Sequence, residues 1–203
     1  MQIGPLVTAA AVVVALSGCG RVEVSASAAV PIPEAYPDDI RPPAGTQYPC
    51  ALTALPRALP GIPEEERSYI NRTYARVLRA TQAKLLALKA LYDERNITQA
   101  TERYQATTTD IVSTLRKDAV PAGLEPFRDN LVKALELQQA FFRKGAQMRQ
   151  SGQSMEAVYA LPEGRQASSL LISAWGQMQS RYRSWNADTS NSIYHHLCAL
   201  DLF

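Results

Sequence analysis

The sequence predicts an all-α fold, an antiparallel four-helix bundle, preceded by an extended and proline-rich tether. Apolar residues recur at steps of three and four along four long segments after residue 63, which is the spacing of an amphipathic helix. Residues that favour helix (Ala, Leu, Gln, Arg and Glu) are abundant, and no segment shows the alternation typical of a β-strand. Nine of the 13 prolines fall between Pro31 and Pro63, where they favour extended backbone.

The composition suits one globular domain, because the 203 residues are 46% apolar and 20% charged. We divide the chain into a leader over residues 1–18, a tether over residues 19–63 and a helical domain over residues 64–203. The 21 basic and 19 acidic residues give a formal net charge of +2. So small an excess of positive charge does not predict a nucleic-acid partner.

The first two helices are predicted on either side of Asn96. Pro63 and the three glutamates after it suit the N-terminus of the first helix. Its apolar stripe alternates steps of four and three residues: Ile70, Tyr74, Val77, Thr81, Leu85, Leu88 and Tyr92. Thr98 is expected to cap the second helix. The stripe of that helix is more polar: Thr101, Tyr104, Thr108, Ile111 and Leu115.

The third helix is expected to begin near Pro126 and to end at Ser151 and Gly152. Its predicted buried face has seven members: Phe127, Leu131, Leu135, Gln138, Phe142, Gly145 and Met148. One or two short helical turns are expected over residues 154–161, before Pro162.

The last helical segment carries the longest stripe: Leu171, Ala174, Trp175, Met178, Tyr182, Trp185, Ile193, Leu197 and Leu200. The polar run over residues 186–191 disfavours helix, so we expect a bend or a restart near Asp188. A helix of about 25 residues spans about 38 Å, and four such helices account for most of the domain. Their short connections favour antiparallel neighbours.

The N-terminus holds an uncharged apolar run from Leu6 to Leu16, too short for a comfortable membrane span. The run ends in Leu16-Ser17-Gly18-Cys19, which resembles the lipobox of bacterial lipoprotein signal peptides. The resemblance covers about the first 20 residues, and it departs from the family pattern because no Lys or Arg precedes the apolar run. It implies cleavage before Cys19 and a diacylglycerol on the Cys19 thiol, which anchors the chain to a membrane.

The resemblance also implies a location, the bacterial cell envelope. Gly20 and Arg21 follow the cysteine, with no Asp directly after it. By analogy with lipoprotein sorting, this favours the periplasmic face of the outer membrane if the host is diderm. The tether would then hold the helical domain off the bilayer, with a reach of at most about 100 Å between Cys19 and Cys50.

With Cys19 assigned to lipid, Cys50 and Cys198 remain. An even remainder in an exported chain predicts one disulfide, which would join the end of the tether to the end of the domain. The alternative is a metal site, in which reduced Cys50 and Cys198 bind zinc or copper with His195. His195 and His196 point about 100° apart on a helix and do not easily share one ion. His196 lies nearer the predicted stripe, so we expect it to be the more buried.

Catalytic motifs are absent from the sequence: there is no H-E-x-x-H pair, no Glu-x-x-His, no C-x-x-C-H and no G-x-S-x-G. We therefore predict no enzyme activity and no cofactor. A haem held without covalent bonds would need His196 and one of three methionines: Met148, Met155 or Met178. Trp175, Tyr182 and Trp185 form a candidate binding face, for which the competing interpretation is core packing.

These observations predict a noncatalytic envelope lipoprotein that acts as a scaffold, an assembly partner or an accessory subunit. Its expected partners are the membrane, through the lipid anchor, and another envelope protein or a cell-wall polymer. The alternative hypothesis is a helical bundle that binds a small solute, haem or a metal ion. Such different functions share this fold, so the fold alone does not separate them.

Overall fold

The computed structural model describes residues 61–203, and this part of the chain is helical without a β-strand. The all-α prediction is therefore confirmed for the helical domain. Six helices follow one another: α1 (Glu64–Asp93), α2 (Ile97–Lys117), α3 (Glu125–Gln150), α4 (Met155–Tyr159), α5 (Pro162–Arg181) and α6 (Ala187–Leu200).

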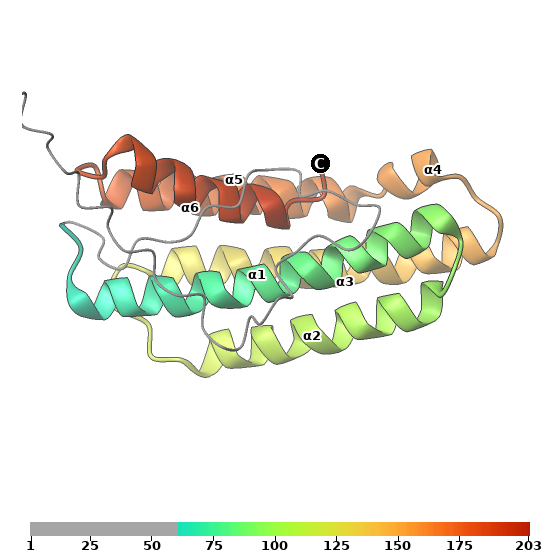
Figure 1. Ribbon diagram of the computed structural model, residues 1–203, viewed down its shortest axis with the longest axis horizontal. Helices are drawn as coiled ribbons and strands as arrows, with labels where there is room; N and C mark the ends of the chain where they lie inside the picture. The colour runs from blue at the N-terminus through green and yellow to red at the C-terminus, as the bar shows by residue number, and fades with distance from the viewer. Residues whose placement is uncertain (1–60) are drawn as a thin grey trace, which may run out of the picture.

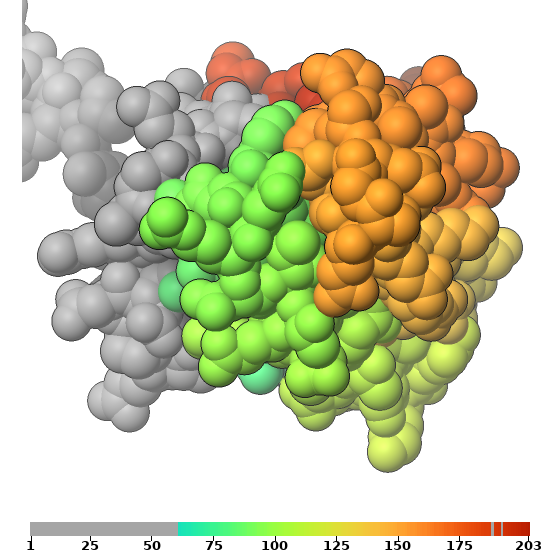
Figure 2. Space-filling view, turned by 90° about the vertical axis from the view of Figure 1, so that its right-hand side faces the viewer, coloured from blue at the N-terminus to red at the C-terminus, as the bar shows by residue number. Residues whose placement is uncertain are grey.

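The long helices lie side by side, and the chain reverses direction at each connection (Figure 1). Helix α2 packs on α1 and α3, and the most extensive helix pair is α3 with α5. Helix α6 packs on both α1 and α5, so the C-terminal end of the chain lies against the first helix. Figure 2 views the end of the molecule where α4 (orange) lies beside the turn from α1 to α2 (green).

The turn between α1 and α2 is short because two residues adopt left-handed backbone. Glu94 and Asn96 both have a φ of 54°. Asn tolerates this region, whereas Glu adopts it rarely. Arg149 of α3 supports the turn, since its guanidinium pairs with Glu94 and its Nε donates to the Leu91 carbonyl at 3.0 Å.

The predicted stripes form the core. All five stripe residues of α2 are buried, and six of the seven named for α3 are buried, with Met148 partly exposed. In α1 the stripe is buried from Ile70 to Leu85, but Tyr92 is 56% exposed, which corrects the last position of that prediction. Tyr92 lies in the final turn of α1, where its hydroxyl contacts that of Tyr159 at 3.1 Å.

The last predicted segment is two helices. Helix α5 ends at Arg181, and α6 begins at Ala187 with the Asn186 side chain accepting from the Thr189 N–H at 2.8 Å. The expected restart near Asp188 is therefore confirmed within one residue. Because α6 folds back along α1 and α5, a further helix lies beside the four long helices that the periodicity predicts. The short turn expected before Pro162 is α4, capped by Ser154.

Candidate functional site

The predicted cysteines and histidines lie at or near the end of α6, or outside the described residues. Cys19 and Cys50 fall outside residues 61–203, so the Cys50–Cys198 disulfide stays a prediction. Cys198 is partly buried in the last turn of α6. His196 is buried and its ring meets Tyr74 edge-to-face with centroids 5.4 Å apart, whereas His195 is partly exposed. The expected order of burial of the two histidines is confirmed.

Metal-ligating side chains do not gather in the described helices: within residues 61–203 no three His, Cys, Asp or Glu lie close enough to hold an ion. The site proposed from Cys50 includes a residue outside this range. Within the described residues, the His196 ring packs against Tyr74. The metal hypothesis therefore stays a prediction.

The candidate aromatic face divides into two groups. Tyr182 and Trp185 stack with their ring centroids 4.8 Å apart and an interplanar angle of 16°. Trp175 instead meets Tyr194 of α6 edge-to-face at 5.5 Å. All three predicted residues pack against the larger apolar core. Their contacts agree with the core-packing interpretation, and ligand binding at this face stays a prediction.

The most distinctive polar cluster holds the end of α6, and the prediction from sequence missed its central residue, Lys84. This α1 side chain is 1% exposed. Its Nζ donates to the carbonyl of Ala199 at 2.6 Å and also to the carbonyl of Asp201. Lys84 lies seven residues, or two helical turns, after Val77 of the buried stripe. This spacing alone could have predicted that Lys84 is buried.

Gln138 of α3 contacts the Leu200 carbonyl, which lies between the two carbonyls that Lys84 contacts. Its Nε2 donates to the Leu200 oxygen at 2.8 Å, and its Oε1 accepts from the Tyr104 hydroxyl of α2 at 2.7 Å. Three successive main-chain carbonyls at the end of α6 thus receive buried side-chain donors. The last carbonyls of a helix have no partner within it, so these donors meet a requirement of the fold.

Helix α5 adds a fourth contact, because the Ser168 hydroxyl bonds to the Asp201 carboxylate. That carboxylate also accepts from the Leu202 N–H at 2.6 Å. We call the four side chains that come from α1, α2, α3 and α5 the C-terminal clamp: Lys84, Tyr104, Gln138 and Ser168. The clamp joins the four other long helices to the end of the sixth.

Burial sets the charge state of the clamp lysine. It lowers the pKa of Lys84 to about 7, while the Asp201 carboxylate acts in the opposite direction. The negative end of the α6 dipole also favours the charged form, but it does not offset the loss of hydration. A neutral amine has two N–H donors, which matches the two carbonyls it contacts.

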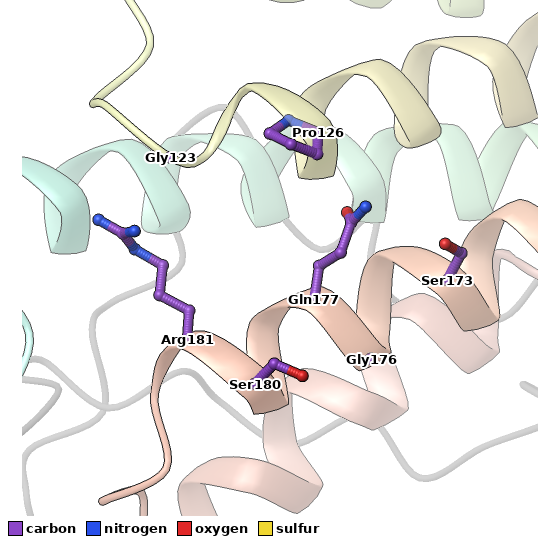
Figure 3. A pocket seen from close by; sticks show the side chains of 7 residues that line it. All are labelled: Gly123, Pro126, Ser173, Gly176, Gln177, Ser180 and Arg181. Atoms are coloured by element: carbon purple, nitrogen blue, oxygen red, sulfur yellow. The ribbon is translucent and has the colours of Figure 1, made fainter.

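A second feature is an open groove between the start of α3 and the second half of α5, with a volume of about 670 Å³ (Figure 3). Ser173 and Gln177 point from α5 toward α3, and Arg181 extends toward Gly123. Its lining combines residues around the start of α3 with residues of α5: Gly123, Pro126, Ser173, Gly176, Gln177, Ser180 and Arg181.

Polar contacts already link both walls of the groove. Asn130 Nδ2 donates to Ser173 Oγ at 3.1 Å and to Gln177 Oε1 at 3.2 Å. Arg181 pairs with Glu66 at 2.7 Å and donates to the Ala122 carbonyl at 2.9 Å. The space in front of Gly176 stays open, since a Cβ added there would meet no atom within 4 Å.

The outer face of α5 is unusual because it has no charged residue between Arg165 and Arg181. Ile172 is 65% exposed on it. Its other exposed positions are small or amide side chains: Gln166, Ser169, Ser173, Gln179 and Ser180. The exposed faces of α1, α2 and α3 carry charges instead: Arg72, Glu102 and Lys133 are examples. Depletion of charge is typical of the centre of a protein–protein interface.

No family model, curated protein or solved structure matches this chain. None of the helices within residues 61–203 combines the length and the hydropathy that a membrane span requires.

The depressed pKa of Lys84 predicts how stability changes with pH. Between about pH 7 and pH 10 the unfolded chain holds a proton on this lysine that the folded chain has lost. The free energy of unfolding of the wild type should therefore rise with pH across this window, relative to Lys84→Met. Chemical denaturation at several pH values measures the difference. Lys133→Met, at an exposed position of α3, is the control; it keeps Lys84, so its free energy of unfolding should change with pH in parallel with the wild type. Parallel profiles for wild type and Lys84→Met would show that Lys84 stays charged in the fold.

Gln138 and Gln139 offer a matched test of the clamp. Gln138→Leu leaves the buried Tyr104 hydroxyl and the Leu200 carbonyl without their partner, which should lower the free energy of unfolding by about 2–5 kcal/mol. Gln139 is partly exposed and donates to the Thr108 hydroxyl, so Gln139→Leu should lower it by less than about 1.5 kcal/mol. Urea denaturation at pH 7 measures both, and equal losses would contradict the role of the clamp.

Proposed function

We propose that this chain is a noncatalytic scaffold or assembly partner of the bacterial cell envelope, lipid-anchored through Cys19. The observation that carries the proposal is the uncharged outer face of α5, where Ile172 is 65% exposed beside an open groove. The lipobox-like run that ends at Cys19 supports the location. Protein contact is the activity that such a surface serves.

The α5 face suits a protein partner for two physical reasons. Water can leave it without stripping the hydration shell from a charge, a step that opposes burial of charged side chains. Ile172 then gains apolar contact, which contributes roughly 1.5–3 kcal/mol when a side chain of this size passes from exposed to buried. A partner surface rich in apolar and small side chains fits these properties better than a charged cell-wall polymer does.

The anchor and the domain are connected in this proposal by the proline-rich tether of residues 19–63. The domain is then a four-helix bundle of α1, α2, α3 and α5, with α6 packed along it. A Cys50–Cys198 disulfide would attach the tether to α6 one residue before the carbonyls that the clamp holds. A pull on the lipid anchor would therefore pass through α6 into α1 and α3, and the clamp would resist it.

Intact mass spectrometry of the chain extracted from membranes tests the anchor and the disulfide together. We expect a mature chain that begins at Cys19 with added acyl chains and with two hydrogens fewer than the reduced form. Cys19→Ser should lose the acyl mass and leave the membrane fraction. Cys198→Ser is the control for the disulfide and should keep the acyl mass. An unmodified mature chain in the soluble fraction would contradict the anchor, and two titratable thiols would contradict the disulfide.

Site-specific crosslinking in the native envelope tests the scaffold role. A photo-crosslinking side chain in place of Ser173, on the α5 face, should yield a crosslinked protein species. The same side chain in place of Glu102, on the charged and exposed face of α2, is the control and should yield none. Crosslinks from both positions, or from neither, would contradict α5 as the contact surface.

A further inference from the structure

We propose that α5 is a self-complementary surface through which two copies of this chain pair, with Ile172 of each copy entering the groove beside Gly176 of the other. The inference rests on the proposed function in using the same face of α5, and it names the occupant of that face. The partner is a second copy of this chain, arranged with its α5 antiparallel to the first.

The spacing of Ile172 and Gly176 along α5 allows each copy to make the same contact with the other. Ile172 and Gly176 lie one helical turn apart, each two residues from Ala174. A two-fold axis perpendicular to α5 at the level of Ala174 therefore places Ile172 of one copy opposite Gly176 of the other, and the reverse contact follows by symmetry. An isologous dimer requires such a patch, on which each protrusion meets its own complement.

The shapes of the two positions are complementary. Ile172 projects from the surface and is 65% exposed. Gly176 lines the groove, and the space in front of it is open for at least the first 4 Å around an added Cβ. The protrusion and the hollow thus belong to one helix, which is what a pair of identical surfaces needs.

Small side chains around this pair allow close approach of the two helices. Ser169, Ser173 and Ser180 share the outer face with Gly176 at steps of four, three and four residues. Interaxial distances between packed helices depend on the side chains at the contact, and small ones permit the shorter distances. The hydroxyls can bond across the contact or keep water at its rim.

The centre of the contact carries no charge that would oppose the pairing, and the exposed Arg165 and Arg183 lie at its rim. No charged residue lies between Arg165 and Arg181, so the two copies bring no like charges together at the centre of the contact. Arg181, at one end of the face, is already paired with Glu66. The exposed faces of α1, α2 and α3, by contrast, would bring several charges against themselves in a two-fold contact. Lipid anchoring would confine the copies to one surface and raise their effective concentration.

Cysteine crosslinking of the full chain in its native envelope tests the inference. Ser173→Cys lies close to the proposed axis, and a short bifunctional maleimide should convert it to a species of twice the chain mass. Glu102→Cys on α2 is the matched control and should stay at the mass of one chain. Adding Gly176→Leu to Ser173→Cys fills the groove and should reduce the doubled species at least tenfold, while circular dichroism shows unchanged helix content.

The outcomes separate this inference from the proposed function. A doubled species that persists with Gly176→Leu would overturn the seating of Ile172 in the groove. A Ser173→Cys product whose mass is that of this chain plus a different protein would overturn the dimer and leave the scaffold proposal standing. Sedimentation of the purified full chain provides the second measurement, in which wild type should be dimeric and Ile172→Glu monomeric. A monomeric wild type at concentrations where the crosslink forms would also overturn the inference.

Discussion

The fold depends on how the end of α6 is held. A helix that ends inside a protein leaves its last carbonyls without partners, and each such buried group costs free energy. Here Lys84 and Gln138 supply the donors, and they lie 115 and 62 residues before the carbonyls that they contact. Lys84 gives up most of its hydration to do so, and its pKa falls to about 7 as a result. The same contacts bind the first and third helices to the last one.

The contact at the end of α6 also decides which part of α5 is covered by α6 and which part stays exposed to a partner. Because the end of α6 is held against α1, α6 lies along α1 and α5 and covers the side of α5 that bears Trp175. Ile172, which lies one helical turn before Trp175, and the groove are outside this contact and are left at the surface. The clamp therefore divides α5 into a covered side and a side that can receive a partner. A tether attached at Cys198 would enter the fold at its most constrained end.

The core of the domain was largely predictable, because burial on a helix follows a period of 3.6 residues that is written locally in the sequence. The stripes from Ile70 to Leu85 and from Thr101 to Leu115 are buried as the periodicity predicts. The restart near Asp188 was predictable from the polar run before it. Tyr92 was assigned to the core by the same rule and is exposed, because the buried positions in the last turns of α1 are Ala87, Ala90 and Leu91, on a different side of the helix.

The sequence by itself determined the helices, their buried faces and, through the lipobox-like run, the prediction of an anchored envelope protein. Only the tertiary structure decided what the buried polar side chains do. Lys84 and its acceptor at Ala199 are 115 residues apart, and no local period relates a donor to an acceptor at that separation. The exposed side of α5 also depends on contacts between distant residues, although its uncharged run is visible in the sequence. Which side of it faces solvent was settled by the packing of α3 and α6 against it.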